Sequence, residues 1–177
     1  MNEELEKRMY FFVPYNISPI QQAIQAGHAA LEYAYEYGQE ADYLDFVKNW
    51  KTWIILNGGT TNNSFMKDKN CYAGSLDNIR HQISKKDINY SIFQEPDLND
   101  ALTTVCFICD ERVFNYKDYP EFYEWSSDLL KEPALRRMSP EKQKEFYPDH
   151  YEKWVANILN GKKNEFLRNL LRGKKLA

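Results

Sequence analysis

The chain has 177 residues, of which 43% are hydrophobic and 28% are charged, a balance typical of a globular protein that buries a core. The net charge of −3 excludes a basic coat over the whole chain of the kind that drives bulk nucleic-acid binding. No apolar run approaches the roughly 20 residues of a membrane span, and the charged N-terminal segment does not resemble a signal peptide. We therefore expect a cytoplasmic protein without membrane contact.

The first strand and the first helix carry the clearest local signals. Residues 9–13 form a short apolar run that ends at Pro14, as expected of a buried strand. Ser18 can cap a helix that starts at Pro19 and ends at Gly38. Two stripes recur at helical spacing in this helix, and we expect the more apolar one to be buried. The apolar stripe is Ile20, Ile24, Gly27, Leu31 and Ala34, and the opposite stripe is Gln21, Gln25, His28 and Glu32.

Helices and strands then alternate along the chain. The expected elements are a helix at 41–50, a strand at 52–56, a turn at 57–59, a polar loop at 60–70, a helix at 75–86, and strands at 88–93 and 102–109. Strands separated by helices favour a parallel pair, and the last two strands favour an antiparallel hairpin. This order predicts an α/β fold in which a mixed four-stranded sheet has helices on both faces.

After residue 115 the strand signals disappear, which predicts a helical C-terminal extension. Helices are expected at 122–130, 140–146, 151–159 and 166–171. We therefore divide the chain into an α/β domain, residues 1–114, and a helical extension with a basic end, residues 115–177. That basic end includes Arg168 and Arg172, which could contact phosphate groups or could equally belong to a solvated helix end.

Cofactor and metal chemistry find little support in the sequence. Cys106 and Cys109 form a Cys-x-x-Cys pattern, but they lie inside an expected strand, where positions three apart point to opposite faces. Two sulfurs placed in this way do not readily share a zinc ion. The sequence also contains no glycine-rich phosphate loop, nucleophile elbow or His-Glu-x-x-His motif. We therefore expect neither a metal nor another cofactor.

Two groups of polar residues are candidates for a functional site. Gln21, Gln25 and His28 share one face of the first helix. Carboxamides can recognise a base or a sugar hydroxyl, and a histidine can act as acid, base or hydrogen-bond anchor, unless it only bridges a neighbouring loop. The loop at 94–100 could orient a water, bind a ribose or form a solvated turn. Its carboxylates are Glu95, Asp97 and Asp100.

These segments carry a resemblance to a known family. Residues 21–30, Gln-Gln-Ala-Ile-Gln-Ala-Gly-His-Ala-Ala, resemble the first-helix signature Gln-x-x-His-Ala of the type 2 (archaeal and eukaryotic type) peptidyl-tRNA hydrolases. Residues 95–105 and 166–171 resemble shorter variants of that superfamily, some of them viral. The resemblance covers residues 9–110 and implies the same mixed sheet.

The departures from the family concern catalysis. Family enzymes carry a lysine at the position of Gln21 and an Asp-Ala-Gly-Arg-Thr segment before the last strand, which this chain lacks. A carboxamide offers no charge to a phosphate or to a scissile ester. The resemblance thus implies hydrolysis of peptidyl- or aminoacyl-tRNA, whereas the lost lysine favours a non-catalytic binder of RNA or a nucleotide-type ligand. If the source is viral, that ligand would be a host nucleotide signal and the protein would act in the host cytoplasm.

Each interpretation assigns roles to particular residues. The candidates for catalysis are His28, Glu95 and Asp97, and those for ligand contacts are Gln21, Gln25, Asn99, Thr103, Arg168 and Arg172. The expected partner is tRNA or a nucleotide-type small molecule. A third interpretation is an interaction protein, in which the helical extension covers the cleft or pairs two subunits in a homodimer.

Overall fold

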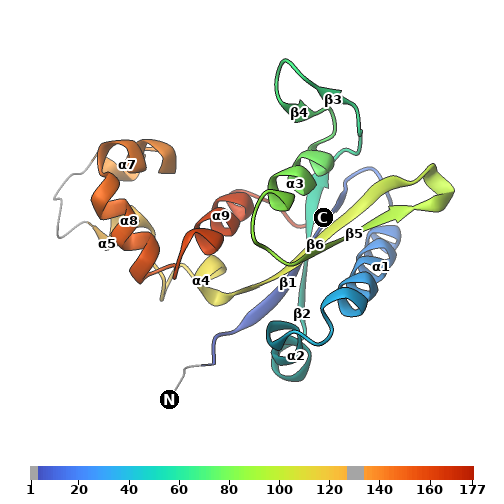
Figure 1. Cartoon of the computed structure of the whole chain (residues 1–177), viewed down its shortest axis with the longest axis horizontal. Helices are drawn as coiled ribbons and strands as arrows, with labels where there is room; N and C mark the ends of the chain where they lie inside the picture. Colours follow the sequence, from blue (N-terminus) through green and yellow to red (C-terminus); the bar gives the residue numbers. More distant parts are fainter. Residues whose placement is uncertain (1–3, 127–133) are drawn as a thin grey trace. The chain divides into compact units, whose positions relative to one another are not determined.

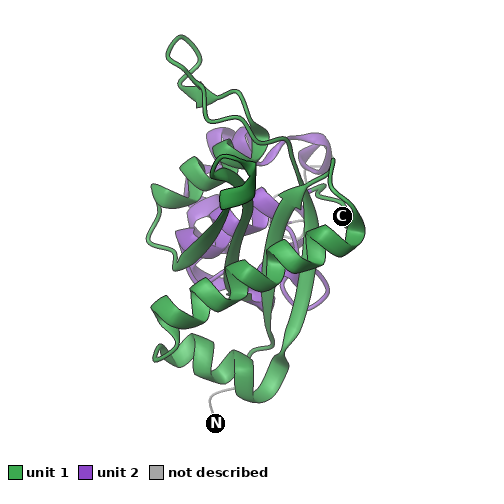
Figure 2. Cartoon of the chain, turned by 90° about the vertical axis from the view of Figure 1, so that its right-hand side faces the viewer, with its two compact units in different colours: residues 1–109, 173–177 green, residues 110–172 purple. Residues whose placement is uncertain are grey.

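The structure is a computed structural model that describes residues 4–126 and 134–177 (Figure 1). The chain divides into two compact units, which Figure 2 shows in different colours. Unit 1 comprises residues 1–109 and 173–177, and unit 2 comprises residues 110–172. The first boundary falls inside the predicted domain 1–114 because Asp110 already caps a helix of unit 2, its side chain accepting from the Arg112 N–H.

Unit 1 contains a four-stranded sheet with the strand order β2-β1-β6-β5. Strand β1 (Lys7–Pro14) pairs in parallel with β2 (Thr52–Gly59). Strand β5 (Tyr90–Glu95) pairs in antiparallel with β6 (Ala101–Asp110). The predicted α/β fold with a mixed four-stranded sheet is confirmed.

Helices cover both faces of this sheet (Figure 1). Helix α1 (Pro19–Tyr37) packs on the face that carries Phe11, and helix α3 (Ser75–Ser84) packs on the face that carries Phe12. Adjacent residues of β1 point to opposite faces because side chains alternate along a strand. The core under α1 consists of Met9, Phe11, Ala26, Ala29, Tyr33, Phe46, Cys106 and Ile108.

Helix α1 begins and ends where the sequence predicts, but the prediction of its buried stripe is wrong. The Ser18 and Gln21 side chains form a reciprocal capping box, and Gly38 is the C-cap. The buried residues of α1 are Gln22, Gln25, Ala26, Ala29 and Tyr33. Four apolar side chains instead point to solvent, namely Ile20 (74% exposed), Ile24 (52%), Leu31 (70%) and Tyr35 (92%). Alanines let α1 lie close to the sheet, and buried glutamines are tolerated where their amides find hydrogen-bond partners.

Three further elements of unit 1 differ from the prediction. The predicted helix 41–50 consists of α2 (Ala41–Asp45) and the π-helical segment η1 (Phe46–Trp50). Strand β2 runs through the predicted turn at 57–59. The predicted polar loop 60–70 contains β3 (Phe65–Met66), which forms a short hairpin with β4 (Cys71–Tyr72).

Residues 173–177 return to unit 1 and lie along the outer edge of β2. Leu176 forms an antiparallel bridge with Leu56. On either side of it, the Asn57 N–H donates to the Lys175 carbonyl at 2.9 Å and the Ala177 N–H donates to the Ile55 carbonyl at 3.1 Å. The predicted extension 115–177 therefore includes a segment that belongs to unit 1 and bonds to the edge strand of its sheet.

Unit 2 is helical, which confirms the predicted helical character of the C-terminal region. Its described elements are α4 (Glu111–Phe114), α5 (Phe122–Trp125), the 3₁₀ turn η3 (Leu135–Arg137), α7 (Pro140–Phe146), α8 (Pro148–Asn157) and α9 (Lys162–Leu171). Residues 127–130 of the predicted helix 122–130 lie outside the described residues. The core of unit 2 consists of Phe122, Leu135, Tyr151, Trp154, Val155 and Leu159. None of the helices in the described ranges has the length and apolar character needed to cross a membrane.

Replacing Gly58 tests the packing of α3 on the sheet. We expect Gly58→Ala to lower the free energy of unfolding by about 1–3 kcal/mol, since overpacking a core position strains its neighbours. A Cβ at Gly58 would lie 2.8 Å from Leu76 Cδ1 and 3.2 Å from the Val13 carbonyl oxygen. Chemical denaturation followed by circular dichroism, at low protein concentration, measures the change.

Gly27→Ala is the matched control for that substitution. A Cβ at Gly27 would meet no atom within 4 Å, and the residue lies inside α1. Alanine should therefore raise the free energy of unfolding by about 0.5–1 kcal/mol, the usual gain over glycine in a helix. A Gly58→Ala variant that is as stable as the wild type, or more stable, would contradict the close approach of α3 to Gly58.

Candidate functional site

The carboxamide of Gln25 is held at both ends and forms the centre of the candidate site. Its Nε2 donates to Glu95 Oε2 at 2.5 Å, and Thr103 Oγ1 donates to its Oε1 at 2.6 Å. Gln25 is 8% exposed and Thr103 only 2%, so water competes little for these bonds. Helix α1, the end of β5 and strand β6 thus bring together three residues, each of which the sequence predicted separately as a site residue.

A pocket of about 230 Å³ lies beside this hydrogen-bond network. Its lining is Ile17, Gln21, Gln25, Glu95, Asp97, Leu98 and Thr103. Apart from Ile17 and Leu98, these are residues that sequence reasoning proposed as catalytic or ligand-binding. The lining contributed by the described residues contains two carboxylates and no lysine or arginine, so the pocket has an acidic character.

Gln21 serves the helix start and the pocket at the same time. Its Oε1 accepts from the Ser18 backbone N–H and from Ser18 Oγ, both at 3.0 Å. These contacts commit the carbonyl end of the side chain to the capping box. The Nε2 donors are the part of Gln21 that a ligand in the pocket could use.

The pocket lining does not include His28 or Asn99. His28 lies one helical turn beyond Gln25 and is exposed, and its ring stacks on Phe93 with centroids 4.5 Å apart and an interplanar angle of 22°. Asn99 is an exposed residue in the left-handed region, with a φ of 54°, at the turn between β5 and β6. Asparagine tolerates that conformation better than most residues, so Asn99 suits the turn.

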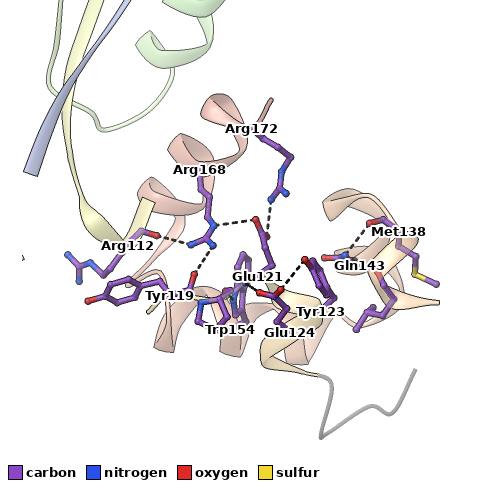
Figure 3. A network of polar contacts seen from close by, with 12 residues as sticks. Arg112, Tyr119, Glu121, Tyr123, Glu124, Met138, Gln143, Trp154, Arg168 and Arg172 are labelled. Carbon is purple, nitrogen blue, oxygen red and sulfur yellow. Dashed lines mark hydrogen bonds and ion pairs between the residues drawn. The ribbon is translucent and has the colours of Figure 1, made fainter. Parts of the chain in front are cut away.

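In unit 2, the buried Arg168 guanidinium connects separate segments of the chain (Figure 3). Arg168 is 1% exposed and donates to the Arg112 carbonyl at 2.9 Å and to the Tyr119 carbonyl at 2.7 Å. Its Nε lies 3.6 Å from Glu121 Oε1. Burial lowers the pKa of Arg168, while the Glu121 carboxylate opposes that shift. A phosphate outside unit 2 cannot reach this guanidinium, so the ligand contact predicted for Arg168 is not available in this structure.

The side chain of Arg172 is 40% exposed and pairs with Glu121 Oε2 at 3.0 Å. Desolvation acts to lower the pKa of Arg172, but its ion pair with Glu121 outweighs that effect and raises it. Arg172 therefore shares the carboxylate that Arg168 contacts from inside unit 2.

The cysteines Cys106 and Cys109 lie outside the pocket lining. Across the described ranges, no three His, Cys, Asp or Glu side chains lie close enough together to hold a metal ion. Cys106 and Cys109 are both buried in β6. Burial raises the pKa of the Cys106 thiol to about 12, which keeps it protonated and weakly nucleophilic at neutral pH.

No protein-family model matches the chain, and no curated protein is significantly similar to it.

The two arginines that share Glu121 should differ in their effect on stability. We expect Arg168→Leu to lower the free energy of unfolding by about 2–5 kcal/mol, because it leaves the Arg112 and Tyr119 carbonyls without their donor, while Glu121 keeps Arg172. Arg172→Leu removes the more exposed partner and should cost about 1 kcal/mol or less. Denaturation followed by tryptophan fluorescence measures these losses of stability, because Trp154 belongs to the core of unit 2. Similar small losses in both variants would contradict the structural role of Arg168.

Proposed function

We propose that the pocket of unit 1 binds a nucleoside-type ligand through its ribose hydroxyls, with Glu95 as the principal acceptor. The observation that carries this proposal is the position of Glu95. Its carboxylate lines the pocket, and one of its oxygens accepts a hydrogen bond from Gln25. A carboxylate can accept about four hydrogen bonds, so Glu95 can accept further hydrogen bonds from a ligand in addition to the one from Gln25. Acidic side chains accept from ribose hydroxyls in the same way in dinucleotide-binding proteins.

The size and charge of the pocket narrow the ligand further. Its volume of about 230 Å³ lies below the range of roughly 300–1,000 Å³ that accommodates drug-sized ligands, which favours a sugar or one base over a dinucleotide. Glu95 and Asp97 repel a phosphate, so any phosphate of the ligand should point out of the pocket. Ile17 and Leu98 offer apolar contacts to the face of a base, and the Gln21 amide can donate to its edge.

Hydrolysis of the ester in peptidyl- or aminoacyl-tRNA is a second proposal, which the position of His28 favours. His28 is exposed on α1 one turn from Gln25, within the segment that resembles the hydrolase signature. A terminal ribose bound at Glu95 would leave its ester to be approached by a water that His28 activates. Among the described residues, the pocket lining offers no cation to stabilise the oxyanion, so we rank this activity second.

Calorimetric titration with nucleosides tests the binding proposal. We expect at least one of the four ribonucleosides to bind, and its 2′-deoxy counterpart to bind about tenfold more weakly or worse, the usual loss for a hydrogen bond to a charged group. Glu95→Gln should weaken binding to a similar extent. The 5′-monophosphate should bind no more tightly than the nucleoside.

Glu40→Gln is the matched control, since Glu40 is an exposed carboxylate of unit 1 that does not line the pocket. It should leave nucleoside affinity unchanged. Equal affinity for the ribose and deoxyribose forms, or unchanged affinity in Glu95→Gln, would refute the assignment of Glu95.

A turnover assay with N-acetyl-aminoacyl-tRNA tests the hydrolase proposal. We expect multiple turnover that falls by about 100-fold or more in His28→Ala, the usual range for removing a general base. Because His28 is exposed, the variant should melt close to the wild-type temperature. His150→Ala, which changes a histidine of unit 2, should retain activity. Absence of turnover would leave nucleoside binding as the function of the pocket, whereas turnover that survives in His28→Ala would refute the role of His28 as the base.

A further inference from the structure

The outward face of α1 carries an apolar stripe that the fold of unit 1 leaves in solvent. We call Ile20, Ile24, Leu31 and Tyr35 the α1 stripe, and their exposed fractions are 74%, 52%, 70% and 92%. We infer that this stripe is a docking surface for a second copy of the chain, with the two α1 helices packed antiparallel. This inference does not depend on the identity of the ligand in the pocket.

The spacing of the stripe makes it continuous along the helix. Intervals of four, seven and four residues keep the side chains on one face of an α-helix. Gly27 lies in the middle of the stripe, and a Cβ placed there would meet no atom of the described residues within 4 Å. The helix therefore offers a shallow gap at its centre, flanked by larger apolar side chains, where another helix could approach closely.

An antiparallel pair makes this surface complementary to itself. With the two-fold axis beside Gly27, Ile24 faces Leu31 of the second copy and Ile20 faces its Tyr35. Each large side chain then contacts an apolar partner, and the glycines lie at the crossing point. A two-fold interface needs this kind of self-complementarity, because both copies present the same patch.

The charges of α1 do not oppose this pairing. Helix α1 contains two acids, Glu32 and Glu36, and no lysine or arginine. Neither acid belongs to the α1 stripe, and Glu36 faces the sheet, where its Oε2 accepts from Ser91 Oγ at 3.4 Å. Two stripes packed against each other therefore form an interface centre without charged side chains, as the centres of protein interfaces usually are.

The area of the stripe fits a dimer that dissociates on dilution. The exposed parts of the four side chains amount to about 400 Å² of largely apolar surface per copy. Stable complexes bury about 800 Å² per partner, so the stripe supplies the apolar centre and the polar side chains around it must supply the remainder. We therefore expect a concentration-dependent dimer.

Sedimentation velocity of the full chain over a range of concentrations tests this inference. The wild-type protein should shift from monomer to dimer as its concentration rises, whereas Leu31→Glu and Ile24→Lys should sediment as monomers throughout. Both residues are exposed, so circular dichroism should show folded variants. Leu44→Glu is the control, because Leu44 is an apolar side chain of α2 with 47% exposure outside the stripe, and it should dimerise like wild type. A wild-type monomer at every concentration, or a dimer that persists in Leu31→Glu, would overturn the inference.

Cross-linking tests the antiparallel register separately. In a Cys71→Ser background, Gly27→Cys should form a disulfide-linked dimer under mild oxidation, because the two thiols would meet near the two-fold axis. Leu44→Cys in the same background should remain monomeric on a non-reducing gel. A dimer that sediments normally but does not cross-link through Gly27→Cys would overturn the antiparallel register.

Discussion

The hydrogen bonds that satisfy Gln25 constrain the orientation of α1 together with the buried Ala26, Ala29 and Tyr33. A buried carboxamide is tolerated only where its donors and acceptor are paired, and Gln25 finds both partners in Glu95 and Thr103. Gln22 adds a second such contact, since its Nε2 donates to the Pro14 carbonyl at 3.0 Å. The buried alanines Ala26 and Ala29 let the helix backbone approach the sheet. The resulting orientation of α1 brings α1, β5 and β6 together at the pocket and turns the more apolar face of the helix to solvent.

Unit 2 depends on a buried polar group in a comparable way. Arg168 lies 1% exposed beside a small aromatic core and connects the chain at Arg112, Tyr119 and Glu121. Its ring contact with Tyr116, at 4.2 Å, adds a face on which the flat guanidinium can stack. These contacts join segments far apart in the sequence, so the Arg168 side chain connects the start of unit 2 to α9. In both units a buried polar side chain thus connects a helix to segments that lie far from it in the sequence.

Much of the fold could be predicted because its signals are local. Ser18, Pro19 and Gly38 delimit α1, and the apolar runs of the four sheet strands are visible in the sequence. The buried face of α1 could not be predicted from periodicity, because the partners of Gln25 lie 70 and 78 residues away along the chain. A stripe of glutamines and alanines looks polar until those partners are known.

The candidate site was predicted in its chemistry and only partly in its geometry. The polar lining could be proposed because Gln25, Glu95 and Thr103 lie in segments with recognisable chemistry. Ile17 and Leu98 carry no such signal, since apolar residues in loops become a pocket wall only through the fold. The stacking of His28 on Phe93 likewise requires the position of β5 under α1, and the burial of Arg168 requires the core of unit 2.

The pairing of Leu176 with Leu56 has a consequence for how the protein behaves among other chains. An uncovered edge strand offers unpaired N–H and C=O groups to any extended peptide, which is a common route to aggregation. The segment at 173–177 occupies part of that edge on β2 by bonding to Ile55 and Asn57. Deleting this segment, or displacing it with a fused tag, would expose the row of backbone groups and make β2 a template for sheet growth between molecules.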